Sequence, residues 1–122
     1  MNRDGIYLRH MLDAIEKIES YIAVGRETFL STSHWHDAVI RQLEIIGEAT
    51  KRLSQPLRDQ YNAIPWRRIA GLRDVLIHDY MGVDLEAVWE ITQRQLPDLK
   101  TTIEFMLQTD DGQSSEDTER LT

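Results

Sequence analysis

Apolar residues recur at steps of three and four along most of the chain, which is the spacing of one face of an α-helix. The first such stripe consists of Tyr7, Met11, Ile15, Ile18 and Ile22. Gly25 follows it and offers a stop, because glycine is common just after a helix C-terminus. We therefore predict a first helix over about residues 4–24.

A second helix is predicted from the Ser31-Thr32-Ser33 cluster to about Leu53, because short hydroxyl side chains favour helix N-termini. Its apolar stripe consists of Val39, Leu43, Ile46 and Leu53. Pro56 and Pro65 then bracket a linker with room for one short helical turn.

A third helix is predicted with Pro65 in its first turn, where the missing N–H is tolerated, and with Gly82 at its end. Its stripe consists of Ile69, Leu72, Leu76 and Tyr80.

A last helix is predicted from Asp84, a suitable N-cap, to about Leu107, with a kink at Pro97. Its inward positions are Leu85, Val88, Thr92, Leu96, Leu99, Ile103 and Met106. The polar, acidic segment 108–122 is expected to be a disordered tail.

These elements indicate an all-α fold in one domain, residues 1–107, arranged as an antiparallel bundle of four to five helices. The chain shows neither strand-like alternation nor an internal repeat. Ile40, Ile45 and Trp89 lie outside the main stripes, so we expect a second apolar face that is covered in a homodimer.

Charge narrows the possible partners. The formal net charge is −7, from 14 basic and 21 acidic residues, which disfavours a broad contact with nucleic acid. Between Ile64 and His78, however, the chain carries three arginines, Arg67, Arg68 and Arg73, and a single acid, Asp74. Any contact with a polyanion should therefore be local, as in an enzyme that grips one phosphate.

Several classes of protein are disfavoured. No apolar run approaches the roughly 18 residues of a membrane span, and no signal peptide is evident, so a cytoplasmic protein without membrane contact is expected. Cysteine is absent. His34-x-His36 would point apart on a helix, and we predict no metal and no cofactor.

The chemistry-bearing residues concentrate between Ile64 and Tyr80. Arg73 and His78 are five apart, about 140° around an ideal helix, and so cannot both face one small target from a straight helix. Either the helix loosens, or the arginine side chain wraps around it, or two copies of the segment meet. The third arrangement would build a site from two subunits.

Arg73-x4-His78-x-Tyr80 resembles the signature of HepT toxins, a branch of the HEPN domains. The flanking Ile64-Pro65-Trp66-Arg67 and Gly71-Leu72-Arg73 runs are similar to that branch, as is Ile46-Gly47-Glu48-Ala49. The resemblance covers roughly residues 4–107. One departure is Asp74, since asparagine often follows the arginine in the family.

The resemblance implies a dimeric helical bundle whose two Arg73–His78 pairs face a shared cleft and cleave RNA as a metal-independent endoribonuclease. Asp74, Arg67 and Glu48 are expected to support them. It also implies a toxin–antitoxin pair, in which a nucleotidyltransferase antitoxin silences the toxin by transferring AMP from ATP to Tyr80. The toxin and the antitoxin can then form a higher hetero-oligomer.

The residues themselves are compatible with this chemistry. Histidine can act as acid or base near neutral pH, and arginine presents a permanent positive fork to phosphate oxygens. Two other interpretations stay open: a non-catalytic nucleotide- or partner-binding subunit of a nucleotidyltransferase complex, and a dimeric helical scaffold.

Overall fold

The computed structural model describes residues 3–72 and 84–121, with side chains at 3–72 and 84–109. Within these residues the regular structure is helical. The elements in chain order are α1 (Arg3–Ile22), α2 (Arg26–Ser31), α3 (Ser33–Lys51), α4 (Gln55–Gln60), α5 (Trp66–Ala70), α7 (Leu85–Glu90), the π-helix η1 (Ile91–Gln95) and α8 (Leu96–Leu121). The prediction of an all-α fold is confirmed for this part of the chain.

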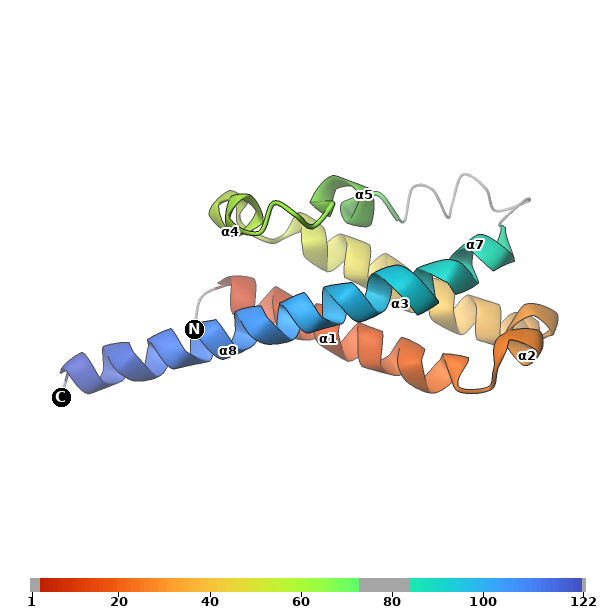
Figure 1. Cartoon of the computed structure of the whole chain (residues 1–122), viewed down its shortest axis with the longest axis horizontal. Helices are drawn as coiled ribbons and strands as arrows, with labels where there is room; N and C mark the ends of the chain where they lie inside the picture. The colour runs from red at the N-terminus through yellow and green to blue at the C-terminus, as the bar shows by residue number, and fades with distance from the viewer. Residues whose placement is uncertain (1–2, 73–83, 122) are drawn as a thin grey trace.

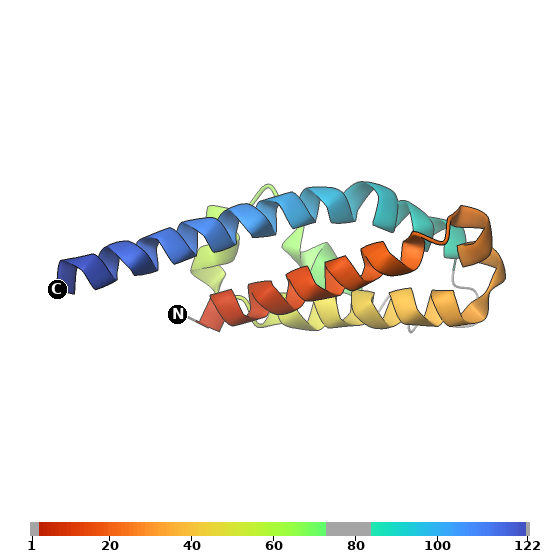
Figure 2. The same ribbon diagram turned by 90° about the horizontal axis from the view of Figure 1, so that it is seen from below.

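Three long helices, α1, α3 and α8, make up a three-helix frame (Figures 1 and 2). α1 runs antiparallel to both α3 and α8, and it packs along each of them. The apolar stripes predicted from the sequence face inward. Side chains no more than 1% exposed include Met11, Ile15, Ile18, Val39, Leu43, Ile46 and Ile103.

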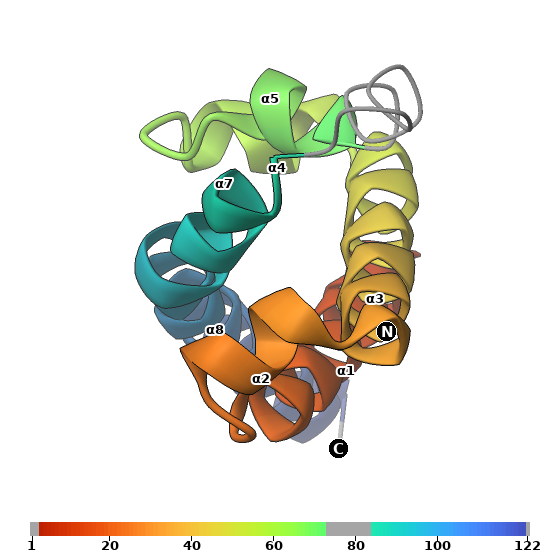
Figure 3. The ribbon, with the colours of Figure 1, turned by 90° about the vertical axis from the view of Figure 1, so that its right-hand side faces the viewer.

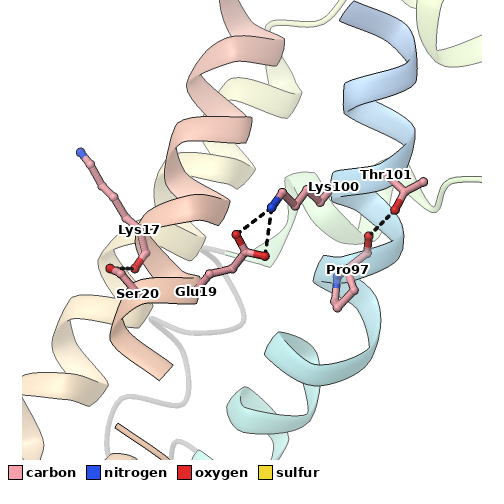
Figure 4. Close-up of polar contacts among 6 residues, drawn as sticks. All are labelled: Lys17, Glu19, Ser20, Pro97, Lys100 and Thr101. Atoms are coloured by element: carbon pink, nitrogen blue, oxygen red, sulfur yellow. Dashed lines mark hydrogen bonds and ion pairs between the residues drawn. The ribbon is translucent and has the colours of Figure 1, made fainter. Parts of the chain in front are cut away.

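A polar contact also joins two helices of the frame. Lys100 Nζ on α8 lies 2.9 Å and 3.2 Å from the two carboxylate oxygens of Glu19 on α1 (Figure 4). This hydrogen-bonded ion pair raises the pKa of Lys100 above its ordinary value of 10.5, with smaller contributions from Glu104 and Glu16. The pair is solvent-exposed, so it adds little to the stability that the apolar core provides.

α2 was not predicted, and it covers the end of the frame at which α1 turns into α3 (Figure 3). Its Phe29 is fully buried and lies 5.3 Å, ring centre to ring centre, from Trp89 of α7. Arg26 of α2 also forms an ion pair of 3.0 Å with Glu86 of α7. The sequence pattern missed α2 because six residues are too few to show a helical period.

The helix expected from Pro65 to Gly82 is interrupted after five residues. α5 begins at Trp66, with Pro65 as its N-cap, and ends at Ala70. Gly71 caps it by donating its N–H to Arg67 O. Glycine disfavours a helix interior, which accounts for the break. Residues 73–83 of the predicted helix lie outside the described residues.

The predicted N-cap at Asp84 is confirmed, because its carboxylate accepts a hydrogen bond of 3.1 Å from Ala87 N. The predicted kink at Pro97 takes the form of a π turn directly before it. Leu96 donates its N–H to Ile91 O, five residues back, and not to the usual position four residues back. The wider turn accommodates the proline, whose ring would otherwise crowd the preceding turn of an α-helix.

Two further expectations differ from the structure. The helix predicted to end near Leu107 continues to Leu121 and projects past the rest of the bundle (Figures 1 and 2). No proline interrupts this segment, so the backbone of the expected tail can remain helical. Ile40, Ile45 and Trp89, taken as exposed, are half-buried against the core of their own chain and do not by themselves indicate a dimer.

Candidate functional site

The three residues of the predicted signature, Arg73, His78 and Tyr80, lie outside the described residues, as does the supporting residue Asp74. The structure describes the chain up to Leu72 on one side of them and from Asp84 on the other. The site is therefore built from α5, which leads into the signature, and from the helices that hold α5 in place.

Trp66 anchors the first turn of α5. It is the buried residue of this helix, with 7% of its surface exposed. Its indole N–H lies 3.2 Å from Arg58 O and 3.1 Å from Tyr61 O, so it donates to the carbonyl groups at the end of α4. These bonds satisfy a polar group that burial would otherwise leave unpaired. α4 and α5 together form an α4–α5 arm, residues 55–70, on one side of the frame.

Gly47 allows α5 to approach α3 closely. A Cβ atom at this position would lie 3.1 Å from Ile69 O and 3.5 Å from Ala70 O. The first distance is shorter than an ordinary van der Waals contact. The absence of a side chain thus sets how near the last residues of α5 come to α3. Because Ala70 is three residues before Arg73, this contact positions the chain just ahead of the signature.

The two supporting residues that the structure describes occupy different helices. Arg67 is solvent-exposed on α5. Glu48 is half-buried on α3, next to Gly47, and its carboxylate lies 3.2 Å from Lys51 Nζ. Their supporting roles in catalysis remain predictions.

An apolar groove of about 620 Å³ opens beside α5, lined by α3, α5, η1 and α8. Its most buried lining residues are Ile46 of α3 and Leu96 and Leu99 of α8, at 0%, 4% and 6% exposure. Ile69, Leu72 and Ile91 line it while remaining half-exposed. Leu72 is the residue directly before Arg73, so the groove begins within one residue of the signature.

Polar side chains also line the apolar groove. Arg68, Gln95 and Asp98 are all solvent-exposed and contribute a cation, an amide and a carboxylate. The groove therefore combines aliphatic surface with a few hydrogen-bonding groups, as small-molecule sites commonly do. The sequence pattern does not reveal this feature, because Ile46, residues 63–72 and residues 91–102 meet only in the folded chain.

A second groove, of about 540 Å³, lies between α1 and α3 and has a different character. Tyr7 and His10 line it from α1, with ring centres 5.9 Å apart in an edge-to-face arrangement. Arg41, Glu48 and Arg52 line it from α3. Its charges are of both signs, so it does not present a uniformly cationic surface.

The described residues lack two kinds of feature. No group of three or more histidine, cysteine or acidic side chains in this part of the chain is placed to hold a metal ion. Among the same residues, no helix is both long and apolar enough to cross a membrane.

The fold and this site define a small helical-bundle protein with an arginine–histidine signature that follows a tightly packed short helix. Residues 11–106 match the family model described as "Ribonuclease HepT-like". The chain belongs to the HepT-like ribonuclease family, as its resemblance to HepT toxins predicted.

Relatives support the assignment. The chain is 48% identical over 99 residues to "Gamma-glutamylcyclotransferase and putative RNase" of Methanocaldococcus jannaschii, covering 80% of this chain and 45% of that protein. It is 39% identical to a "Putative RNase" of Caldanaerobacter subterraneus, with coverage of 84% and 92%. It is 41% identical to the "Probable ribonuclease HepT" of Thermococcus cleftensis, with coverage of 80% and 90%. No solved structure matches the chain.

The chain thus spans under half of the first relative and about nine-tenths of the other two.

Proposed function

We propose that the protein is a metal-independent endoribonuclease, the toxin of a toxin–antitoxin pair. The observation that carries the proposal is the Arg73-x4-His78-x-Tyr80 signature in a chain that belongs to the HepT-like ribonuclease family. The names of its relatives as RNases support the same activity.

The chemistry follows from the two catalytic side chains. A base removes the proton of the ribose 2′-OH, the 2′-oxygen attacks phosphorus, and the bond from phosphorus to the 5′-oxygen breaks as that oxygen gains a proton. The products are a 2′,3′-cyclic phosphate and a free 5′-OH. His78 acts in proton transfer, and Arg73 stabilises the charge that develops on the phosphoryl oxygens.

A homodimer would resolve the geometric problem that one straight helix poses. Two copies that meet at their signature segments would place a guanidinium group and an imidazole on opposite sides of one phosphate. Arg67, Asp74 and Glu48 are proposed to support this cleft. Transfer of AMP to Tyr80 by a nucleotidyltransferase antitoxin would add bulk and negative charge and so exclude RNA.

The central test is cleavage of a labelled RNA by the purified chain in excess EDTA, with mass analysis of the product ends. We expect a 2′,3′-cyclic phosphate, and we expect His78→Ala and Arg73→Ala to abolish cleavage. His34→Ala and Arg26→Ala, at exposed positions elsewhere in the bundle, serve as matched controls and should retain activity. Cleavage that survives in His78→Ala would reject the mechanism.

The toxin–antitoxin part has its own test. Expression of the chain alone should arrest growth, and co-expression of a partner nucleotidyltransferase should relieve the arrest while adding the mass of AMP to the chain. Tyr80→Phe should block both the added mass and the relief. Relief without any mass change would reject AMP transfer as the silencing step.

A further inference from the structure

We propose that the apolar groove is a subsite for a base of the RNA that carries an exocyclic amino group, such as adenine or cytosine, next to the scissile phosphate. The inference rests on the proposed ribonuclease function and adds a substrate preference to it. It is drawn from residues outside the signature, contributed by α3, α5, η1 and α8.

The position of the groove is the first argument. Leu72 lines it and is bonded to Arg73, and consecutive Cα atoms are about 3.8 Å apart. A nucleotide whose phosphate is held by Arg73 therefore has the groove within reach of its base. Arg68, on the same groove, supplies positive charge toward the phosphate backbone.

Size and surface are the second argument. The volume of about 620 Å³ lies within the range typical of small-molecule sites. The half-exposed aliphatic side chains of Ile69, Leu72 and Ile91 offer the flat face of a base a surface shielded from water. Ile46 and Leu99 are buried in the core and line the same groove, so this surface is continuous with the core.

The polar groups point to a base that carries an amino group. The amide of Gln95 can accept a hydrogen bond from an exocyclic amino group and donate one to the neighbouring ring nitrogen, a pairing that adenine and cytosine both offer. The carboxylate of Asp98 can only accept, so it also favours a base that carries an amino group. Uracil and hypoxanthine lack that group and would leave these acceptors unpaired.

The position of Gln95 is set by the π turn. η1 spans Ile91–Gln95, and both of its end residues line the groove. Gln93, in the middle of the same turn, is also exposed but does not line the groove, and its amide lies 3.3 Å from Thr92 Oγ1. The chain thus offers two glutamines in one turn, of which one alone is placed to read a base.

The test measures binding and does not depend on cleavage. The full chain, with labelled isoleucine and leucine methyl groups, is titrated with AMP, IMP, UMP and ribose 5-phosphate and followed by NMR. We expect AMP to shift the methyl resonances of Ile46, Ile69 and Leu99, and to bind about tenfold more tightly than IMP or UMP. Ribose 5-phosphate, which has no base, should leave these methyl groups unchanged.

Variants sharpen the result. Gln95→Ala should weaken AMP binding about tenfold, whereas Gln93→Ala should leave it unchanged. Equal binding of AMP, IMP and UMP, or equal effects of the two glutamine variants, would overturn the proposal. So would resonances that respond to dilution of the protein and not to nucleotides, since a second copy of the chain would then cover the groove.

The two proposals fail separately. If AMP does not bind but RNA is cleaved in EDTA, the base subsite alone is rejected. If AMP binds as described but no variant of the chain cleaves RNA, the groove stands as a nucleotide site and the ribonuclease proposal is rejected.

Discussion

The three-helix frame and the α4–α5 arm are held together in different ways. The frame buries long apolar stripes from α1, α3 and α8, and many of its side chains are fully excluded from water. The arm consists of two helices of six and five residues, with Trp66 as its deeply buried side chain. The hydrogen bonds of the Trp66 indole join its two helices to each other. Its place on the frame is set by the close approach at Gly47 and by the hydrogen bonds between Asp4 and Ser54.

This difference teaches where stability and activity should separate. Apolar burial stabilises the frame in proportion to the area removed from water and tolerates small shifts. The arm leads directly into the proposed catalytic residues, where small displacements matter more than small energies. Substitutions in the frame should therefore lower stability first, and substitutions in the arm should lower activity first.

The largest expected effect lies in the frame. Leu43→Ala removes a side chain that is 0% exposed, and we expect it to lower the free energy of unfolding by about 2–5 kcal/mol. Ile69→Ala in the arm, at a half-buried position, should cost clearly less, and Ile6→Ala, at 44% exposure, should be nearly neutral. Urea denaturation measures all three, and equal costs for Leu43→Ala and Ile69→Ala would remove the distinction between the two regions.

A second substitution cuts the link between the regions. Asp4 of α1 accepts hydrogen bonds from Ser54 N at 2.7 Å and Ser54 Oγ at 2.6 Å, and Ser54 is the N-cap of α4. Asp4→Ala should lower the free energy of unfolding by about 1.5–3 kcal/mol, because both bonds involve a carboxylate. Asp13→Ala, at an exposed position of the same helix, is the control for loss of charge and should be nearly neutral.

A third substitution acts on the arm with little energetic change. Gly47→Ala gains up to about 1 kcal/mol of helix propensity, and this gain offsets the strain of a Cβ placed 3.1 Å from Ile69 O. Stability should stay within about 1 kcal/mol of the original. RNA cleavage should fall about tenfold or more, as α5 moves by a few tenths of an ångström. Full activity together with unchanged stability would show that Gly47 does not position the site.

The smallest expected effect concerns Lys100. Its pKa is raised above 10.5 by Glu19, so the contribution of this lysine to stability is present below pH 10.5 and is lost as the pH rises through the raised value. Lys100→Met should change the melting temperature little at neutral pH. The stability difference between the two proteins should shrink further only in strongly alkaline buffer, and a larger difference there would contradict the assignment.

The sequence predicted most of the frame and little of the arm. The stripes of α1, α3 and α8 repeat over enough turns for a helical period to show, and the capping role of Asp84 follows from its residue type alone. The arm escapes such patterns because α4 and α5 are too short, and because the contacts of Gly47 with Ile69 and of Trp66 with Arg58 exist only in the folded chain. The signature was found through its spacing, whereas the groove beside it combines Ile46 with residues 63–72 and 91–102 and has no spacing to find.

The π turn of η1 has a consequence for how this chain can change length. A π turn carries one residue more than an α turn, so the loss of any residue between Ile91 and Gln95 would let the helix close into a regular one. The segments on either side would keep their orientation, so Val88 would stay in the core and the indole of Trp89 would stay beside Phe29. In a regular α-helix the same added residue would instead rotate everything upstream by about 100° relative to α8. The wider turn thus absorbs one residue and keeps the two ends of one long helix in phase with the same core.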